Sequence, residues 1–135
     1  ELAVRWDFDC IKGAWHETET LIKMEDEPFA HGAMRECFRM KKMSQINAAY
    51  FFKMRWEDCN NYVAKRYIAE GVGRDCYFDD VKMQMVSKHY ARRFNMRHPS
   101  PPKKVDFLQA FLIELTRVVD GEPQQLLFCC EAALD

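Results

Sequence analysis

Several short stretches of the chain alternate between apolar and polar residues, and this period of two predicts β-strands. The clearest stretch puts Val63, Lys65 and Tyr67 on one face of a strand and Tyr62 and Ala64 on the other. Lys65 is therefore a cation in the middle of an apolar strand. The stretches that read as strands are 5–10, 16–24, 35–40, 62–68, 105–116 and 126–131, of which the first two form a hairpin.

One longer segment, residues 76–95, repeats its apolar residues at helical spacing, with Val81 and Met85 on the same stripe. Asp75 stands before it as a candidate N-cap. Residues 44–52 could form either a short helix or an ordered loop. The elements together predict an α+β fold, with a mostly antiparallel sheet of about five strands and one main helix.

Length and composition limit the class of protein. With 135 residues, 48% of them hydrophobic, the chain can form one domain with a real core. Twenty basic and twenty-one acidic residues argue against a protein that binds nucleic acid or a membrane surface through excess positive charge. The charged first residues do not read as a secretory signal, and the six cysteines contain no CxxC, so we expect reduced thiols in a cytoplasmic protein.

Lys65 is the first candidate for chemistry. A buried ammonium is costly unless it reaches water or meets an anion. Lys65 therefore either lies on an edge or solvent face of the sheet, or binds a phosphate in a nucleotide cleft as strand lysines of kinases do.

Arg35 is the second candidate, because it follows a flexible link at Gly32-Ala33 where backbone can approach a ligand closely. Its forked guanidinium could hold a phosphate. The alternative is a surface arginine that pairs with Glu36 or Glu57. One glycine is far from a phosphate-binding loop motif, and the four histidines show no spacing that predicts a metal site.

Longer motifs decide between these alternatives, and they carry a resemblance that covers the chain from about Trp6 to Glu131. Two are long: Gly32-Ala33-Met34-Arg35-Glu36-Cys37-Phe38-Arg39 and Asn61-Tyr62-Val63-Ala64-Lys65-Arg66-Tyr67-Ile68. Shorter ones follow in the same order, at Arg74-Asp75, Tyr77-Phe78, Asp80-Val81, Gln84-Met85, Pro101-Pro102-Lys103 and Ile113-Glu114-Leu115. Together they resemble the N-terminal lobe of the alpha-kinase family of atypical serine/threonine protein kinases, and within it the elongation factor 2 kinases.

The resemblance implies an ATP-binding lobe. Lys65 would bind the phosphates of ATP, Arg35 would lie at the phosphate-loop region, and Glu131 would be the hinge glutamate that meets the adenine. Where the family tends to have an acidic residue after Gln-Met in the helix, this chain has Val86, and Asp79 or Asp80 could substitute as a partner for Lys65. The ATP-binding residues implied by the resemblance are Lys65, Arg35, Glu131, Gly32, Ala33 and Met34.

The resemblance also implies what a complete enzyme contains. Family members transfer the γ-phosphate of ATP to serine or threonine with Mg²⁺, and elongation factor 2 kinases act on a translation elongation factor under control of calmodulin. Their catalytic aspartate, metal-binding residues and zinc site belong to a C-terminal lobe without a counterpart in these residues. We therefore expect residues 1–135 to be an ATP-binding lobe, truncated after the hinge and inactive alone; the alternative is a non-catalytic form that binds a partner or acts as a decoy.

Overall fold

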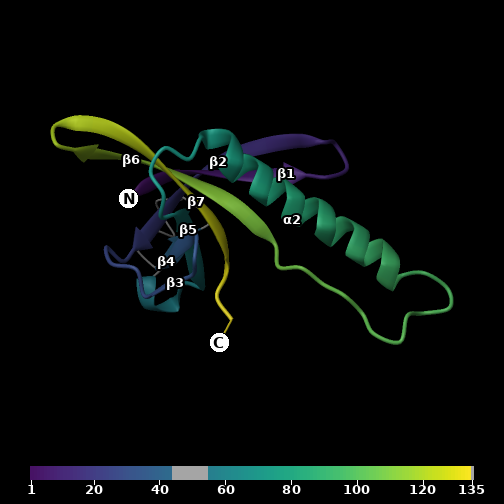
Figure 1. Ribbon diagram of the computed structural model, residues 1–135. Coiled ribbons are helices and arrows are strands. Elements are labelled where there is room, and N and C mark those ends of the chain that lie inside the picture. Colours follow the sequence, from purple (N-terminus) through teal and green to yellow (C-terminus); the bar gives the residue numbers. More distant parts are fainter. Residues whose placement is uncertain (44–54, 135) are drawn as a thin grey trace.

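The computed structural model describes residues 1–43 and 55–134, and these contain seven strands, one α-helix and one 3-10 helix (Figure 1). The open question about residues 44–52 lies outside the described residues. The predicted α+β class is confirmed, with seven strands in place of about five. The strand that none of the predicted stretches covers has only two residues, too few to show alternation. The elements are β1 (Leu2–Asp9), β2 (Ala14–Met24), β3 (Ala30–His31), β4 (Arg35–Met43), η1 (Trp56–Asp58), β5 (Asn61–Tyr67), α2 (Arg74–Asn95), β6 (Ala110–Val119) and β7 (Glu122–Ala132).

Six of these strands close into an antiparallel barrel. The strand order is β2-β1-β6-β7-β5-β4-β3, and a further pairing of β2 with β4 joins the two ends of the six-strand run. Side chains that point inward fill the barrel, as expected for one this narrow. The buried interior consists of Ala3, Ile22, Phe38, Met40, Ala64, Phe111, Ile113, Leu115, Phe128 and Cys130.

Helix α2 packs against the outside of the barrel, on β6, β7 and β1 (Figure 1). Tyr77 and Val81 of α2 are buried against the barrel, and Phe78 of α2 makes edge-to-face contacts with Trp6 and Trp15. The predicted apolar stripe of the helix therefore packs in the hydrophobic core between α2 and the barrel. Within the described part of the chain, no helix has the length and apolar character needed to cross a membrane.

Strands β6 and β7 are apolar on both faces because one face fills the barrel and the other lies under α2. The predicted turn between them is confirmed. Asp120 and Gly121 have φ of 53° and 79°, the left-handed conformation that a two-residue hairpin with the twist of the strands requires.

Several predicted boundaries were wrong, and two of them have a physical reason that the structure shows. Helix α2 begins at Arg74 with Gly73 at the N-cap and no side-chain cap, so Asp75 lies in its first turn, where its charge favours the helix dipole. The strand predicted from residue 105 begins at Ala110, because helix side chains bind the preceding backbone in place of a neighbouring strand. These bonds join Gln84 to the carbonyl of Leu108 (2.7 Å), Lys88 to that of Phe107 (2.7 Å), and Asn95 to both backbone groups of Val105 (2.6 and 3.0 Å).

Candidate nucleotide-binding site

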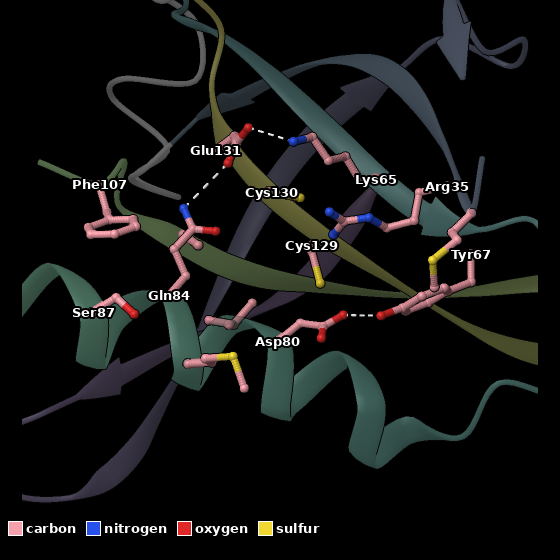
Figure 2. Close-up of a pocket in the computed structure, with 14 residues that line it drawn as sticks. Arg35, Lys65, Tyr67, Asp80, Gln84, Ser87, Phe107, Cys129, Cys130 and Glu131 are labelled. Atoms are coloured by element: carbon pink, nitrogen blue, oxygen red, sulfur yellow. Dashed lines mark hydrogen bonds and ion pairs between the residues drawn. The ribbon is translucent and has the colours of Figure 1, made fainter. Parts of the chain in front are cut away.

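A cavity of about 390 Å³ lies between α2 and the outer face of β4, β5 and β7 (Figure 2). This volume lies within the range of roughly 300–1,000 Å³ that is typical of small-molecule sites. A second hollow of about 660 Å³ lies elsewhere on the barrel, and none of the predicted site residues lines it. The lining of the first cavity includes Met34, Arg35, Lys65, Tyr67, Asp80, Met83, Gln84, Phe107, Cys129 and Glu131.

Strand register brings Lys65 and Glu131 together. Lys65 pairs with Cys129 across β5 and β7, and Glu131, two residues further along, points to the same face. Lys65 Nζ lies 2.7 Å from Glu131 Oε1, and both side chains are about three-quarters buried, with 26% and 20% of their surface exposed. Lys65 does not lie on an edge strand, because β5 is flanked by β4 and β7. Its side chain lines the cavity beside α2 and is 26% exposed, so it does not lie on an open solvent face either.

Arg35 lines the same cavity from the start of β4, and Figure 2 shows its guanidinium in the space beside Lys65. The alternative pairing with Glu36 or Glu57 is wrong, since Glu36 pairs with Arg66 and Glu57 with Arg55. Within residues 1–43 and 55–134, Arg35 forms no ion pair. Its charge is therefore available to an anion in the cavity.

The link between β3 and β4 is only partly at the cavity. Met34 lines it, whereas Gly32 and Ala33 do not. Gly32 donates its backbone N–H to the carbonyl of Arg35 at 2.8 Å and closes a tight turn. A Cβ on Gly32 would meet nothing within 4 Å, so the fold itself does not require glycine there. The roles of Gly32 and Ala33 against a nucleotide stay predictions.

The phenol of Tyr67 donates a hydrogen bond to the carboxylate of Asp80, which ties β5 to α2 on the cavity wall (Figure 2). This bond, together with partial burial, raises the pKa of Tyr67 to about 12. Asp80 is thereby committed to Tyr67 and does not serve as the partner of Lys65. Asp79, the other acidic residue considered for that role, is exposed and does not line the cavity.

Cys129 lies in the wall between the two cations and α2 (Figure 2). Its Sγ lies 3.7 Å from the carbonyl oxygen of Tyr77. Burial raises the pKa of the Cys129 thiol to about 12, although Arg35 and Lys65 act in the opposite direction. The thiol is therefore an uncharged part of the wall.

Sequence reasoning missed Gln84, which reaches from α2 toward Glu131. Its helical position was visible in the sequence, but no pattern indicated a contact 47 residues away. Within the described residues, no group of three or more His, Cys, Asp or Glu side chains could hold a metal ion. The two cations that line the cavity, Arg35 and Lys65, support the binding and orientation of an anion.

Known proteins with similar sequences include elongation factor 2 kinases from two mammals. The chain is 48% identical over 115 residues to eukaryotic elongation factor 2 kinase from Homo sapiens, and this match covers 85% of the chain and 15% of the human protein. It is 45% identical over 131 residues to the Mus musculus protein of the same name, covering 97% of the chain and 17% of that protein. The chain thus spans less than a fifth of the length of these relatives.

A solved structure of the alpha-kinase domain of myosin-II heavy chain kinase A in complex with AMP-PNP has the same fold as this chain. Its TM-score is 0.79 at 28% identity, over 99% of this chain and 60% of the solved one. A sequence profile described as the alpha-kinase family matches residues 30–135. Because the matched residues make up more than half of the sequence, the chain belongs to the alpha-kinase family.

Proposed function

We propose that the chain is the ATP-binding lobe of an alpha-type serine/threonine protein kinase. The observation that carries the proposal is the convergence of Arg35 and Lys65 on one cavity from neighbouring strands. An ammonium offers three donors and a guanidinium offers a planar fork, and together they suit the oxygens of a nucleotide phosphate chain. The complex of the similar myosin kinase domain with AMP-PNP supports this assignment.

In the proposed reaction, a serine or threonine hydroxyl oxygen bonds to the γ-phosphorus of ATP, the bond to the β–γ bridging oxygen breaks, and ADP leaves. Lys65 and Arg35 would hold and orient the phosphates. We propose a translation elongation factor as substrate, because the similar human and mouse proteins are named elongation factor 2 kinases. Contact of Glu131 with the adenine, control by calmodulin and a cytoplasmic location stay predictions.

Nucleotide binding is the direct test. Two charge-assisted phosphate contacts, each worth roughly 1.5–3 kcal/mol less the cost of ordering, give a dissociation constant of about 1 mM for these 135 residues. An NMR titration with AMP-PNP measures it, and Lys65→Ala should weaken binding about tenfold or more. Lys12→Ala, at an exposed turn, is the control. Equal affinities of the wild-type chain and Lys65→Ala would contradict the proposal.

We further propose that the 135 residues alone do not transfer phosphate, since they cover 60% of the solved kinase domain in complex with AMP-PNP. Phosphoryl transfer needs a site that neutralises charge and a group that accepts the hydroxyl proton, besides the contacts to the phosphates. A radiolabelled assay of phosphate transfer that compares the chain with Lys65→Ala tests whether the chain alone is active. Turnover by the chain above the level of that variant would overturn this part of the proposal.

A further inference from the structure

Helix α2 offers Lys65 no carboxylate within the described residues. Asp80 is the acidic side chain of α2 that lines the cavity, and it accepts the hydrogen bond of Tyr67. Protein kinases commonly join a helix to the phosphate-binding lysine through a helix glutamate. Here the ammonium of Lys65 pairs instead with Glu131, at the end of β7. A link between α2 and Lys65 therefore has to pass through another group.

Gln84 supplies that link. Its Nε2 lies 2.7 Å from the carbonyl oxygen of Leu108 and 3.4 Å from Oε2 of Glu131. A carboxamide nitrogen carries two N–H donors, so one is available to each acceptor. The carbonyl of Leu108 and the carboxylate of Glu131 both accept hydrogen bonds from Nε2, and this fixes which end of the Gln84 amide is the nitrogen. Figure 2 shows the resulting series of contacts from α2 to β7 and on to β5.

The two oxygens of Glu131 are divided between two partners, with Oε1 bound to Lys65 and Oε2 facing Gln84. A glutamate next to the end of a strand has a side chain with considerable rotational freedom. The second contact restricts that freedom and fixes the direction in which Glu131 holds Lys65. One of the three ammonium donors is thereby used, and two remain for an anion beside Arg35.

We propose that Gln84 is a positioning residue that couples helix α2 to Lys65 through the carboxylate of Glu131. The inference rests on the proposed function in one respect, that a nucleotide phosphate is the anion for which Lys65 is oriented. A movement of α2 would carry Gln84 away, release Glu131 and weaken phosphate binding. The position of α2 then regulates nucleotide affinity through an amide and a carboxylate, without a helix carboxylate.

A test without nucleotide compares the wild-type chain with Gln84→Met, Glu131→Gln and the double variant. Each protein is treated briefly with acetic anhydride, and mass spectrometry gives the acylation rate of Lys65 relative to that of exposed Lys23. Acetic anhydride reacts with an amine through its free lone pair, which an ammonium held by a carboxylate lacks. Gln84→Met loosens that contact and should raise this ratio about threefold, as expected for residues in one network. The double variant should match Glu131→Gln, because Gln84 acts through that carboxylate.

Methionine keeps the length and packing of Gln84 but lacks its donors, and Gln109→Met, at an exposed position, is the matched control. Circular dichroism and a urea midpoint identify any variant that fails to fold. An unchanged Lys65 ratio in a folded Gln84→Met variant, or rates that add in the double variant, would overturn the coupling. An unchanged Lys65 acylation ratio in Glu131→Gln would also overturn the coupling.

A second arm measures AMP-PNP affinity for the same four proteins by NMR. We expect Gln84→Met to weaken binding about fivefold and to add nothing once Glu131 is replaced, since both changes interrupt the same network. If the wild-type chain binds no AMP-PNP, the proposed function fails, while the acylation ratios still decide whether Gln84 positions Lys65. The two conclusions can therefore fail separately.

Discussion

The phenol of Tyr67 and the carboxylate of Asp80 form a hydrogen bond that joins strand β5 to helix α2 beside the candidate nucleotide cavity. A hydrogen bond to a charged acceptor contributes more to stability than a neutral one. Tyr67→Phe removes the donor and should lower the free energy of unfolding by about 1.5 kcal/mol, at the low end for a bond to a charged group because the pair is only partly buried, as measured by urea denaturation. Tyr90→Phe, at an exposed position, should change it little. Equal losses in both variants would contradict the role of this bond.

The same bond predicts a pH dependence. The pKa of Tyr67 is raised to about 12 in the folded chain, against about 10 for an unperturbed tyrosine. Below about pH 10 the phenol keeps its proton in both states and the bond contributes fully; its contribution is lost as the pH rises toward 12. Urea midpoints of wild type and Tyr67→Phe should therefore converge with rising pH. A constant difference between the two across this range would exclude the effect.

The faces of β5 could be predicted from sequence because its two sides meet different surroundings. Ala64 lies inside the barrel, whereas Lys65 and Tyr67 face the cavity and α2. Alternation records such a difference directly. The closure of the barrel by pairing of β2 with β4 could not be predicted. No short turn connects these two strands, so no local sequence pattern indicates that they pair.

Some residues of the candidate site could be predicted from the sequence, and some of its contacts could not. For Lys65 and Arg35, residue type and position left a surface role and a phosphate-binding role open, and only the longer motifs favoured phosphate binding. Gln84 and the ion pair of Lys65 with Glu131 could not be predicted, because each depends on packing between distant segments. The late start of β6 has the same cause, since α2 side chains bind the backbone before it.

Arg35 and Arg39 lie on the same strand and allow a matched comparison. Arg35 faces the cavity without an ion-pair partner among the described residues, whereas Arg39 pairs with Glu25 and stacks on Phe29 away from it. Arg35→Ala should weaken AMP-PNP binding about tenfold, because one charge-assisted contact is lost. Arg39→Ala should leave the affinity unchanged. An NMR titration of both variants checks this, and similar losses in the two would argue against a specific role for Arg35.

The barrel interior predicts where truncation is most costly. Phe128 is 1% exposed and packs edge-to-face on Phe38 inside the barrel, whereas Val118 is 73% exposed near the β6–β7 turn. Phe128→Ala should lower the free energy of unfolding by about 3–5 kcal/mol, since it removes buried surface and leaves a cavity. Val118→Ala should change it by less than about 0.5 kcal/mol. Urea denaturation measures both; a small loss for Phe128→Ala would contradict a filled barrel.

Thiol reactivity provides an independent measure of the cavity wall. Cys76 is exposed, whereas burial raises the pKa of Cys129 to about 12 and that of Cys130 well above its usual range. Only the thiolate attacks an alkylating reagent, so at about pH 8 the buried Cys129 should react much more slowly than the exposed Cys76. Iodoacetamide labelling followed by peptide mass spectrometry measures both rates in one sample.

Unfolding in urea should bring the rates of Cys76, Cys129 and Cys130 close together, because all three thiols then have ordinary surroundings. This denatured sample is the control for differences in peptide detection. Cys129 lines the cavity but is buried in its wall, with 8% of its surface exposed, so its slow reaction would report that burial. Labelling of Cys129 at the rate of Cys76 in the folded chain would show that the two nearby cations outweigh burial and hold the thiol as thiolate.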